Sequence, residues 1–282
     1  MEMVHFIPPS QRRFVLLAAQ ADSAPVLIYG AAGTGKGAIA SWIHLNGPRA
    51  TYPFVIGHQA KPLADQILEA QGGTLAISEI GKWTLSEQKT LLNYLKTKTI
   101  PDPSQDLLPR LVNVRIIGTT SQALESRAQG GLFNQDLLDK LNVFRIDMPS
   151  LTSRRDEFQD IALGIVREIT RELGKEHLRS LSAEAWIRLI SHDWPGNLRE
   201  LRNILRFGVI AAKGDQIENS DLPDFSSNQI DFRTTREEFE RIYILELLKT
   251  FNWEIDRTCV MTHIDKNTLL TKIKNYGIPL GN

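Results

Sequence analysis

Short apolar segments alternate with longer helical patterns over the first 150 residues. The segments expected as helices are Gln11–Gln20 (with Ser10 as its N-cap), Lys36–His44, Pro62–Ala70 and Ser86–Lys96. Between them lie compact apolar runs expected as strands, namely Val26–Tyr29, Phe54–Ile56, Thr74–Ile77, Val112–Gly118 and Val143–Ile146. Because parallel strands need crossover connections, this alternation predicts an α/β fold in which helices cover a five-stranded parallel sheet.

The pattern changes near Pro149, after which strand-like runs stop. Helical patterns follow at Arg154–Glu172, Ala183–Ser191 and Asn197–Ala212, and they predict a small all-helical domain. The stretch from Gly214 to Thr235 has little apolar periodicity and suits a linker, and a further helix is expected over Glu237–Thr250. The expected organisation is an α/β core at 1–150, a helical domain at 151–215, a linker at 216–235 and a helical C-terminal domain at 236–282.

Composition narrows the class of protein. The chain has 282 residues, 42% of them hydrophobic, and 33 basic residues balance 33 acidic ones, so binding to nucleic acid requires a local positive patch. Its single cysteine, Cys259, excludes an internal disulfide and fits a reducing compartment. No apolar run of membrane-spanning length and no signal-peptide pattern occurs, so a cytoplasmic protein without a membrane partner is expected.

A glycine-rich loop directly follows the first expected strand. The residues Gly30, Ala31, Ala32, Gly33, Thr34, Gly35, Lys36 and Gly37 read GAAGTGKG, which matches a phosphate-binding loop except at its last position. Backbone N–H groups, the following helix N-terminus and the lysine ammonium would together bind phosphates. The hydroxyl that normally contacts Mg²⁺ is missing at Gly37. The alternative is an ordinary strand-to-helix turn.

The segment GGTLAISEI, from Gly72 to Ile80, is the second candidate for the nucleotide site. In phosphate-loop ATPases two acids follow such a strand, the first holding Mg²⁺ and the second polarising water. Here Ser78 stands first and Glu79 second, so Ser78 would reach a metal only through water and Mg²⁺ binding is expected to be weakened. The alternative for Glu79 is a solvated carboxylate at a strand end.

Several motifs together resemble the AAA+ domain of sigma-54-dependent transcriptional activators, also called bacterial enhancer-binding proteins. They are GAAGTGKG, PFV, GGTLAISEIG, VRIIGTT, LNVFRIDMPSL and WPGNLRELRN, and they cover roughly Val26 to Ala212. The resemblance implies an AAA+ P-loop core with a lid, and ATP or ADP as the cofactor. It also places Arg199 at the sensor II arginine that contacts nucleotide, and family members likewise lack a hydroxyl after the loop lysine.

The C-terminal segment from Asn252 to Ile278 resembles the Fis-type helix-turn-helix of such activators. Asp265 is expected to cap its last helix and Gly277 to end it, while His263 replaces the family's usual glycine in the turn. Leu269, Ile273 and Tyr276 form the expected inward stripe. The candidate DNA-binding side chains are Lys266, Asn267, Thr271, Lys272 and Lys274. The alternative is a solvated charged face; if the face binds DNA, two copies of the module are expected.

The chain departs from the family at the positions that act in ATP hydrolysis and in contact with sigma-54. Only 16 residues, Ile56 to Gln71, separate PFV from GGTL, and the GAFTGA loop that grips sigma-54 is missing, so no sigma-54 contact by that loop is expected. His58 stands at the switch asparagine and Ser121 at the sensor I position. Asn134 and Lys140 replace the two arginine fingers.

These departures favour a DNA-binding transcriptional regulator whose AAA+ core binds ATP but hydrolyses it poorly, acting without sigma-54 remodelling. One alternative is a slow ATPase in which Glu79 and Lys140 support turnover in a ring. Another is a degenerate subunit that modulates an intact AAA+ activator. Self-association as a dimer or a higher ring fits each hypothesis.

Overall fold

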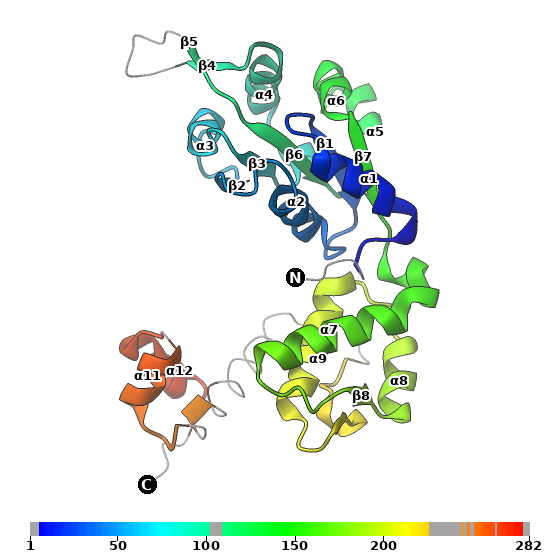
Figure 1. Cartoon of the computed structure of the whole chain (residues 1–282), viewed down its shortest axis with the longest axis vertical. Helices are drawn as coiled ribbons and strands as arrows, with labels where there is room; N and C mark the ends of the chain where they lie inside the picture. The colour runs from blue at the N-terminus through cyan, green and yellow to red at the C-terminus, as the bar shows by residue number, and fades with distance from the viewer. Residues whose placement is uncertain are drawn as a thin grey trace. The chain divides into compact units, whose positions relative to one another are not determined.

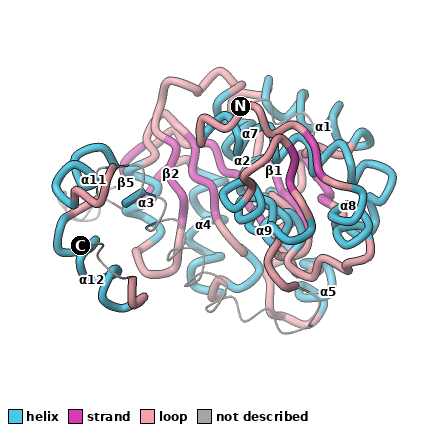
Figure 2. Tube along the Cα trace, turned by 90° about the horizontal axis from the view of Figure 1, so that it is seen from below, coloured by secondary structure: helices cyan, strands magenta, loops and turns pink. Residues whose placement is uncertain are grey.

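A computed structural model of the chain describes residues 6–101, 109–225, 244, 247–248, 251–262 and 264–278. Its main feature is a five-stranded sheet of order β2-β3-β6-β1-β7, in which all neighbours run parallel. The strands are β1 (Val26–Gly30), β2 (Phe54–Gly57), β3 (Thr74–Ile77), β6 (Arg115–Thr120) and β7 (Phe144–Met148). They appear as neighbouring magenta segments in Figure 2. The predicted α/β fold with a five-stranded parallel sheet is confirmed.

Helices cover both faces of this sheet (Figure 1). Helices α1 (Pro9–Gln20) and α2 (Lys36–Leu45) pack on one face, and α3 (Leu63–Glu69), α4 (Leu85–Thr97), α5 (Leu124–Gln129) and α6 (Gln135–Leu141) pack on the other. Strand β1 lies inside the sheet, and its alternate side chains enter the two cores: Val26 and Ile28 join one, Leu27 and Tyr29 the other. Burial on both faces explains its uninterrupted apolar sequence.

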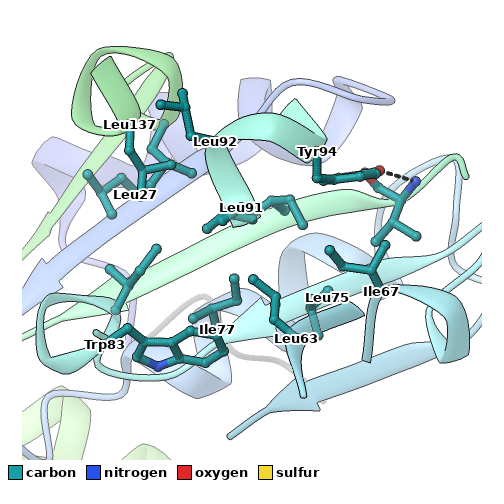
Figure 3. Packing of buried hydrophobic residues seen from close by; sticks show 14 of the residues in the cluster. Leu27, Leu63, Ile67, Leu75, Ile77, Trp83, Leu91, Leu92, Tyr94 and Leu137 are labelled. Atoms are coloured by element: carbon teal, nitrogen blue, oxygen red, sulfur yellow. Dashed lines mark hydrogen bonds between the residues drawn. The ribbon is translucent and has the colours of Figure 1, made fainter. Parts of the chain in front are cut away.

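Figure 3 shows the core beneath α3, α4 and α6. Leu91 and Leu92 of α4 belong to the same buried cluster as Leu137 of α6 and as Leu27, Leu75 and Ile77 of the sheet. At the edge of this core the hydroxyl of Tyr94 accepts a hydrogen bond from the Val114 N–H at 2.8 Å. The two faces of the sheet thus have separate apolar cores that hold the strand ends, and the loops that follow them, in place.

Several local elements differ from the sequence expectation. Helix α1 begins at Pro9 and not after Ser10, because the fixed φ of proline suits the first helical turn. Strand β6 begins at Arg115, since the Val112 N–H is taken by the Lys98 carbonyl oxygen at 2.8 Å. Just before it, β4 (Thr99–Pro101) and β5 (Pro109–Leu111) form an antiparallel pair that the apolar pattern did not predict, and α5 and α6 were also missed.

The chain divides into two compact units, Met1–Ile165 with Asp193–Asn203, and Val166–His192 with Ile204–Asn282. The first unit therefore includes η3 (Leu151–Glu157) and the segment that contains WPGNLREL. The WPGNLREL segment packs within this unit: Trp194 is 3% exposed and lies against Phe158, with ring centroids 5.8 Å apart.

Helices α7 (Phe158–Glu172), α8 (Ala183–Ile190) and α9 (Asn197–Ala211) confirm the helical character expected after residue 151. The domain is not all-helical, however, since β8 (Ser180–Leu181) and β9 (Gln216–Ile217) pair in parallel. Within the expected linker, β9 and η4 (Asn219–Asp221) are folded, and Leu222 and Phe225 are buried. Residues 226–235 of that linker lie outside the described part of the chain.

Near the C-terminus, α11 (Ile255–Thr262) and α12 (Lys266–Asn275) pack around Leu269 and Ile273. The predicted caps are confirmed: the Asp265 carboxylate accepts from two N–H groups of the first turn, and Gly277 has a φ of +58°. The expected helix over 237–250 is described only at 244, 247 and 248, and His263 lies outside the described residues. No helix among the described residues is long and apolar enough to cross a membrane.

Candidate functional site

The glycine-rich loop connects β1 to α2 at the carboxyl edge of the parallel sheet. Gly33 and Gly35 have φ values of +80° and +92°, in the left-handed region that favours glycine, and Gly35 is the N-cap of α2. At Gly33 an added Cβ would lie 2.0 Å from the Gly196 carbonyl oxygen. At Gly37, by contrast, an added Cβ would meet nothing within 4 Å, so space does not explain its missing side chain.

Lys36 is held at the base of this loop, and its side chain is almost fully buried. Its Nζ donates to the carbonyl oxygens of Gly30 at 2.7 Å and Ala31 at 3.0 Å, and it lies 3.2 Å from Glu79 Oε1. These three contacts use the three protons of the ammonium. The predicted lysine and the predicted acidic residue are therefore brought together, although 42 residues separate them.

Glu79 follows strand β3 in a strained position, with a φ of +47°. Its Oε2 accepts hydrogen bonds from the Ser121 N–H at 2.9 Å and the Ser121 Oγ at 2.7 Å. Burial raises the pKa of Glu79, but the bonds from Ser121 and the charge of Lys36 outweigh it and hold the pKa below its ordinary value. The carboxylate is consequently ionised and fully engaged at neutral pH.

The remaining loop residues divide between the interior and the surface. Thr34 is buried and its Oγ1 donates to the Ala31 carbonyl oxygen at 2.9 Å, whereas Ala31, Ala32 and Gly37 are exposed. This leaves the outer rim of the loop open, as a binding loop for phosphates requires.

Residues of the WPGNLREL segment form hydrogen bonds with two carbonyl oxygens of the glycine-rich loop. The Arg199 N–H donates to the Gly33 carbonyl oxygen at 3.2 Å, while the Arg199 side chain is exposed. Asn197 Nδ2 donates to the Ala32 carbonyl oxygen at 3.0 Å. The WPGNLREL motif predicted Arg199 as a site residue but gave no signal for Asn197, although it contains both.

The donor set around the loop fits a nucleotide better than it fits a tightly held metal ion. Ser78 is exposed at the end of β3, Gly37 offers no hydroxyl, and the Glu79 carboxylate is already bonded to Lys36 and Ser121. Within the described residues, no group of three or more His, Cys, Asp or Glu side chains is arranged to hold a metal. A Mg²⁺ ion here would depend on phosphate oxygens and water for most of its ligands.

The two positions expected for arginine fingers have visible structural roles. Asn134 is the N-cap of α6, and its Oδ1 accepts from the Leu137 N–H at 3.0 Å. Lys140 is exposed in the last turn of α6, where a positive charge complements the helix dipole.

The connection from β2 to α3 consists of residues 58–62 alone. The buried side chain of Gln66 closes it: its Oε1 accepts from the His58 N–H at 2.9 Å, and its Nε2 donates to the His58 carbonyl oxygen at 2.8 Å. His58 itself, expected at the position of the family's switch asparagine, is exposed. Nothing in this short loop resembles a long excursion.

The candidate DNA-contacting side chains lie on α12. Lys266, Asn267, Thr271 and Lys274 are exposed and Lys272 is half-buried, while Leu269 and Ile273 face the core as predicted. Lys266 Nζ lies 2.5 Å from Asp256 Oδ1 of α11, and this pairing raises the pKa of Lys266. One of the three lysines therefore has an acidic partner that the linear pattern did not reveal.

Comparison with known proteins agrees with these motifs. Residues 11–151 match the sequence family described as the sigma-54 interaction domain, and residues 152–238 match the AAA+ ATPase lid domain. The chain is 35% identical over 225 residues to the DNA-binding transcriptional regulator NtrC of Klebsiella pneumoniae, covering 72% of this chain and 48% of NtrC. It is 29% identical over 283 residues to the alginate biosynthesis transcriptional regulatory protein AlgB of Pseudomonas syringae pv. tomato, covering 90% of this chain and 62% of AlgB.

Solved structures with a similar fold include a related regulatory protein, NtrX. NtrX from Brucella abortus in complex with ATP aligns with a TM-score of 0.65 and 28% identity, covering 95% of this chain and 67% of NtrX. The ADP complex of the same protein aligns with a TM-score of 0.66 at 26% identity. The chain spans only about half to two thirds of the length of these relatives. With half of its residues matched to one family and the adjoining lid matched as well, the chain belongs to the sigma-54 interaction domain family of AAA+ proteins.

Proposed function

We propose that this chain is a DNA-binding transcriptional regulator whose AAA+ core binds ATP or ADP and hydrolyses ATP slowly or not at all. The observation that carries the proposal is the loop from Gly30 to Lys36, with a buried lysine, left-handed glycines and an open rim. A loop of this shape presents N–H groups and a helix N-terminus to an anion. NtrX, a relative of similar fold, has been solved with ATP and with ADP.

Poor turnover follows from the surroundings of the loop. The Glu79 carboxylate is bonded to Ser121 and Lys36, and its lowered pKa makes it a weak base toward water. An arginine finger contributes a factor of about 10³–10⁵ in rate, and Asn134 has no charge to replace it. Lys140 lacks the planar fork of arginine. Binding of nucleotide needs neither an arginine finger nor a basic carboxylate.

The proposal also holds that the chain does not engage sigma-54 by the family's loop. The support is the five-residue connection 58–62, which is closed by Gln66 and leaves no projecting element between β2 and α3. The match to a family named for sigma-54 interaction reflects the shared core, which the motifs from Gly30 to Leu151 make up.

DNA binding is assigned to α12 and its exposed polar side chains, in line with the transcriptional regulators among the relatives. Because one such module makes few phosphate contacts, the regulator would act as a dimer or a higher ring, in the cytoplasm with the DNA. Another AAA+ activator is an alternative assembly partner.

Titration with a fluorescent ATP analogue tests the nucleotide half of the proposal. Wild type should bind saturably and Lys36→Ala should lose most of the affinity, whereas Lys140→Ala, which removes an exposed lysine, should bind like wild type. Equal binding by wild type and Lys36→Ala would refute the nucleotide site. Recovery of discrete promoter sites in a genome-wide pull-down tests the DNA half, and random recovery that persists after deletion of residues 252–282 would refute it.

A further inference from the structure

Asn197 connects three parts of the first unit through one buried side chain. It is 4% exposed, its Nδ2 donates to the Ala32 carbonyl oxygen at 3.0 Å, and its Oδ1 accepts from the Leu151 N–H at 2.8 Å. Ala32 belongs to the glycine-rich loop, Leu151 begins η3, and Asn197 begins α9. The carboxamide can make both contacts at once, because it carries a donor and an acceptor on separate atoms.

The backbone at this point is held in an unfavourable conformation. Asn197 has a φ of +53° and Trp194 a φ of +51°, both in the left-handed region. Such conformations persist where the surrounding contacts enforce them, and they gather at sites that bind ligands. Here the enforcing contacts include the buried Trp194 ring on Phe158 and the bond from Arg199 N–H to the Gly33 carbonyl oxygen.

The contact with Ala32 also determines where the next N–H group points. Because a trans peptide is planar, its C=O and N–H groups point in opposite directions. Directing the Ala32 carbonyl oxygen toward Asn197 therefore directs the Gly33 N–H away from Asn197. That N–H belongs to the group of loop donors that would face a bound phosphate.

We propose that Asn197 is a positioning residue for the nucleotide: it fixes the Ala32–Gly33 peptide in the orientation that phosphate binding needs. The inference rests on the proposed nucleotide site. By linkage, the orientation that Asn197 stabilises is stabilised in turn by bound nucleotide, so binding also tightens the segment from Trp194 to Arg199.

Two substitutions test the role of the amide. Asn197→Gly removes the side chain and accepts a positive φ without strain, and Asn197→Asp keeps the acceptor for Leu151 but loses the donor to Ala32. Asn203→Asp, at an exposed position of the same helix, is the matched control for the added charge. Fluorescent ATP analogue affinity should fall about tenfold in both Asn197 variants and stay within about twofold of wild type in the control.

Hydrogen exchange provides the readout that a purely structural role would not move. In the wild-type chain, saturating ADP should slow hydrogen exchange in the peptide that contains the Arg199 N–H. In Asn197→Gly, saturating ADP should leave exchange in that peptide unchanged. If Asn197→Gly binds the ATP analogue as tightly as wild type, or shows the same ADP-induced protection, the role of Asn197 is refuted while the proposed nucleotide site stands. Failure of wild type to bind any nucleotide would overturn the proposed function together with it. If Asn197→Asp does not fold, the affinity and hydrogen exchange of Asn197→Gly alone test the positioning role of Asn197.

Discussion

The ammonium nitrogen of Lys36 lies 3.2 Å from Oε1 of Glu79, so the loop lysine and the acid after β3 form an ion pair. The same ammonium donates to the carbonyl oxygens of Gly30 and Ala31, and the other Glu79 oxygen accepts twice from Ser121. A phosphate that recruits Lys36 must therefore compete with a carboxylate that is itself well held.

Replacing Glu79 should for this reason strengthen nucleotide binding. Glu79→Gln removes both the competitor for Lys36 and a negative charge beside the phosphates, and the expected gain in ATP affinity is about threefold to tenfold at moderate salt. Titration with a fluorescent analogue measures it, with Glu184→Gln, an exposed acid on α8, as the charge control. A loss of affinity in Glu79→Gln alone would mean that the carboxylate assists binding.

The pH dependence of stability offers a second check on this pair. Because the folded-state pKa of Glu79 is lowered from its ordinary value of 4.5, its contribution to stability is present above that ordinary value and is lost as pH falls through the lower, folded pKa. The free-energy difference in unfolding between wild type and Glu79→Gln should shrink as pH decreases from about 6 toward 3. Solvent screening limits the difference at neutral pH to about 1 kcal/mol or less. Denaturant titrations at several pH values would show it, and a difference that grows toward acid would contradict the assigned direction.

Glycine is needed at Gly33 for two reasons that a matched pair of variants separates. Gly131 also has a positive φ, +69°, but an added Cβ there meets nothing within 4 Å. Gly131→Ala should cost about 1–2 kcal/mol, the price of the left-handed conformation alone. Gly33→Ala carries the same conformational cost plus the contact with the Gly196 carbonyl oxygen, and should cost distinctly more and abolish nucleotide binding. Denaturant unfolding compares the two, and equal costs would show that the segment at Gly196 moves aside freely.

The open space at Gly37 allows the missing hydroxyl to be restored. Gly37→Ser adds a metal-reaching oxygen to the first turn of α2, while Gly37→Ala adds the Cβ without it. Both should stabilise the helix by about 0.5–1 kcal/mol. Only Gly37→Ser should make ATP affinity more dependent on Mg²⁺, measured by titration with and without the ion. The same Mg²⁺ dependence in the alanine variant would rule out a direct hydroxyl contact.

On α12 the prediction concerns the pairing of Lys266 with Asp256. If this helix contacts DNA phosphates, Lys274→Ala should weaken binding and lower the salt slope by about 1, uniformly across sequences. Asp256→Asn frees Lys266 and removes an acid near the duplex, and it should strengthen binding. Fluorescence anisotropy with duplex DNA at several salt concentrations measures both effects. If Lys274→Ala strengthens DNA binding and Asp256→Asn weakens it, the DNA contacts another face of the domain.

Local patterns in the sequence predicted the central sheet and the loop, since buried strands and the glycine-rich turn depend on neighbouring residues. Other features depend on residues far apart in the chain. The bonds from Ser121 to Glu79 span 42 residues and the bond from Asn197 to Ala32 spans 165, so periodicity could not reveal either. Helices α5 and α6 have six and seven residues, too short for a clear repeat. The role of Asn134 as an N-cap is a local signal that could have been read.

Identifying the bound nucleotide shows whether the chain binds ATP and hydrolyses it poorly. Wild type and Lys36→Ala are incubated with ATP and Mg²⁺, separated from free nucleotide after a fixed time, and analysed by chromatography. We expect close to one nucleotide per wild-type chain, recovered mainly as unhydrolysed ATP, and almost none on Lys36→Ala. Recovery of ADP formed from the added ATP, or of no nucleotide on wild type, would contradict it.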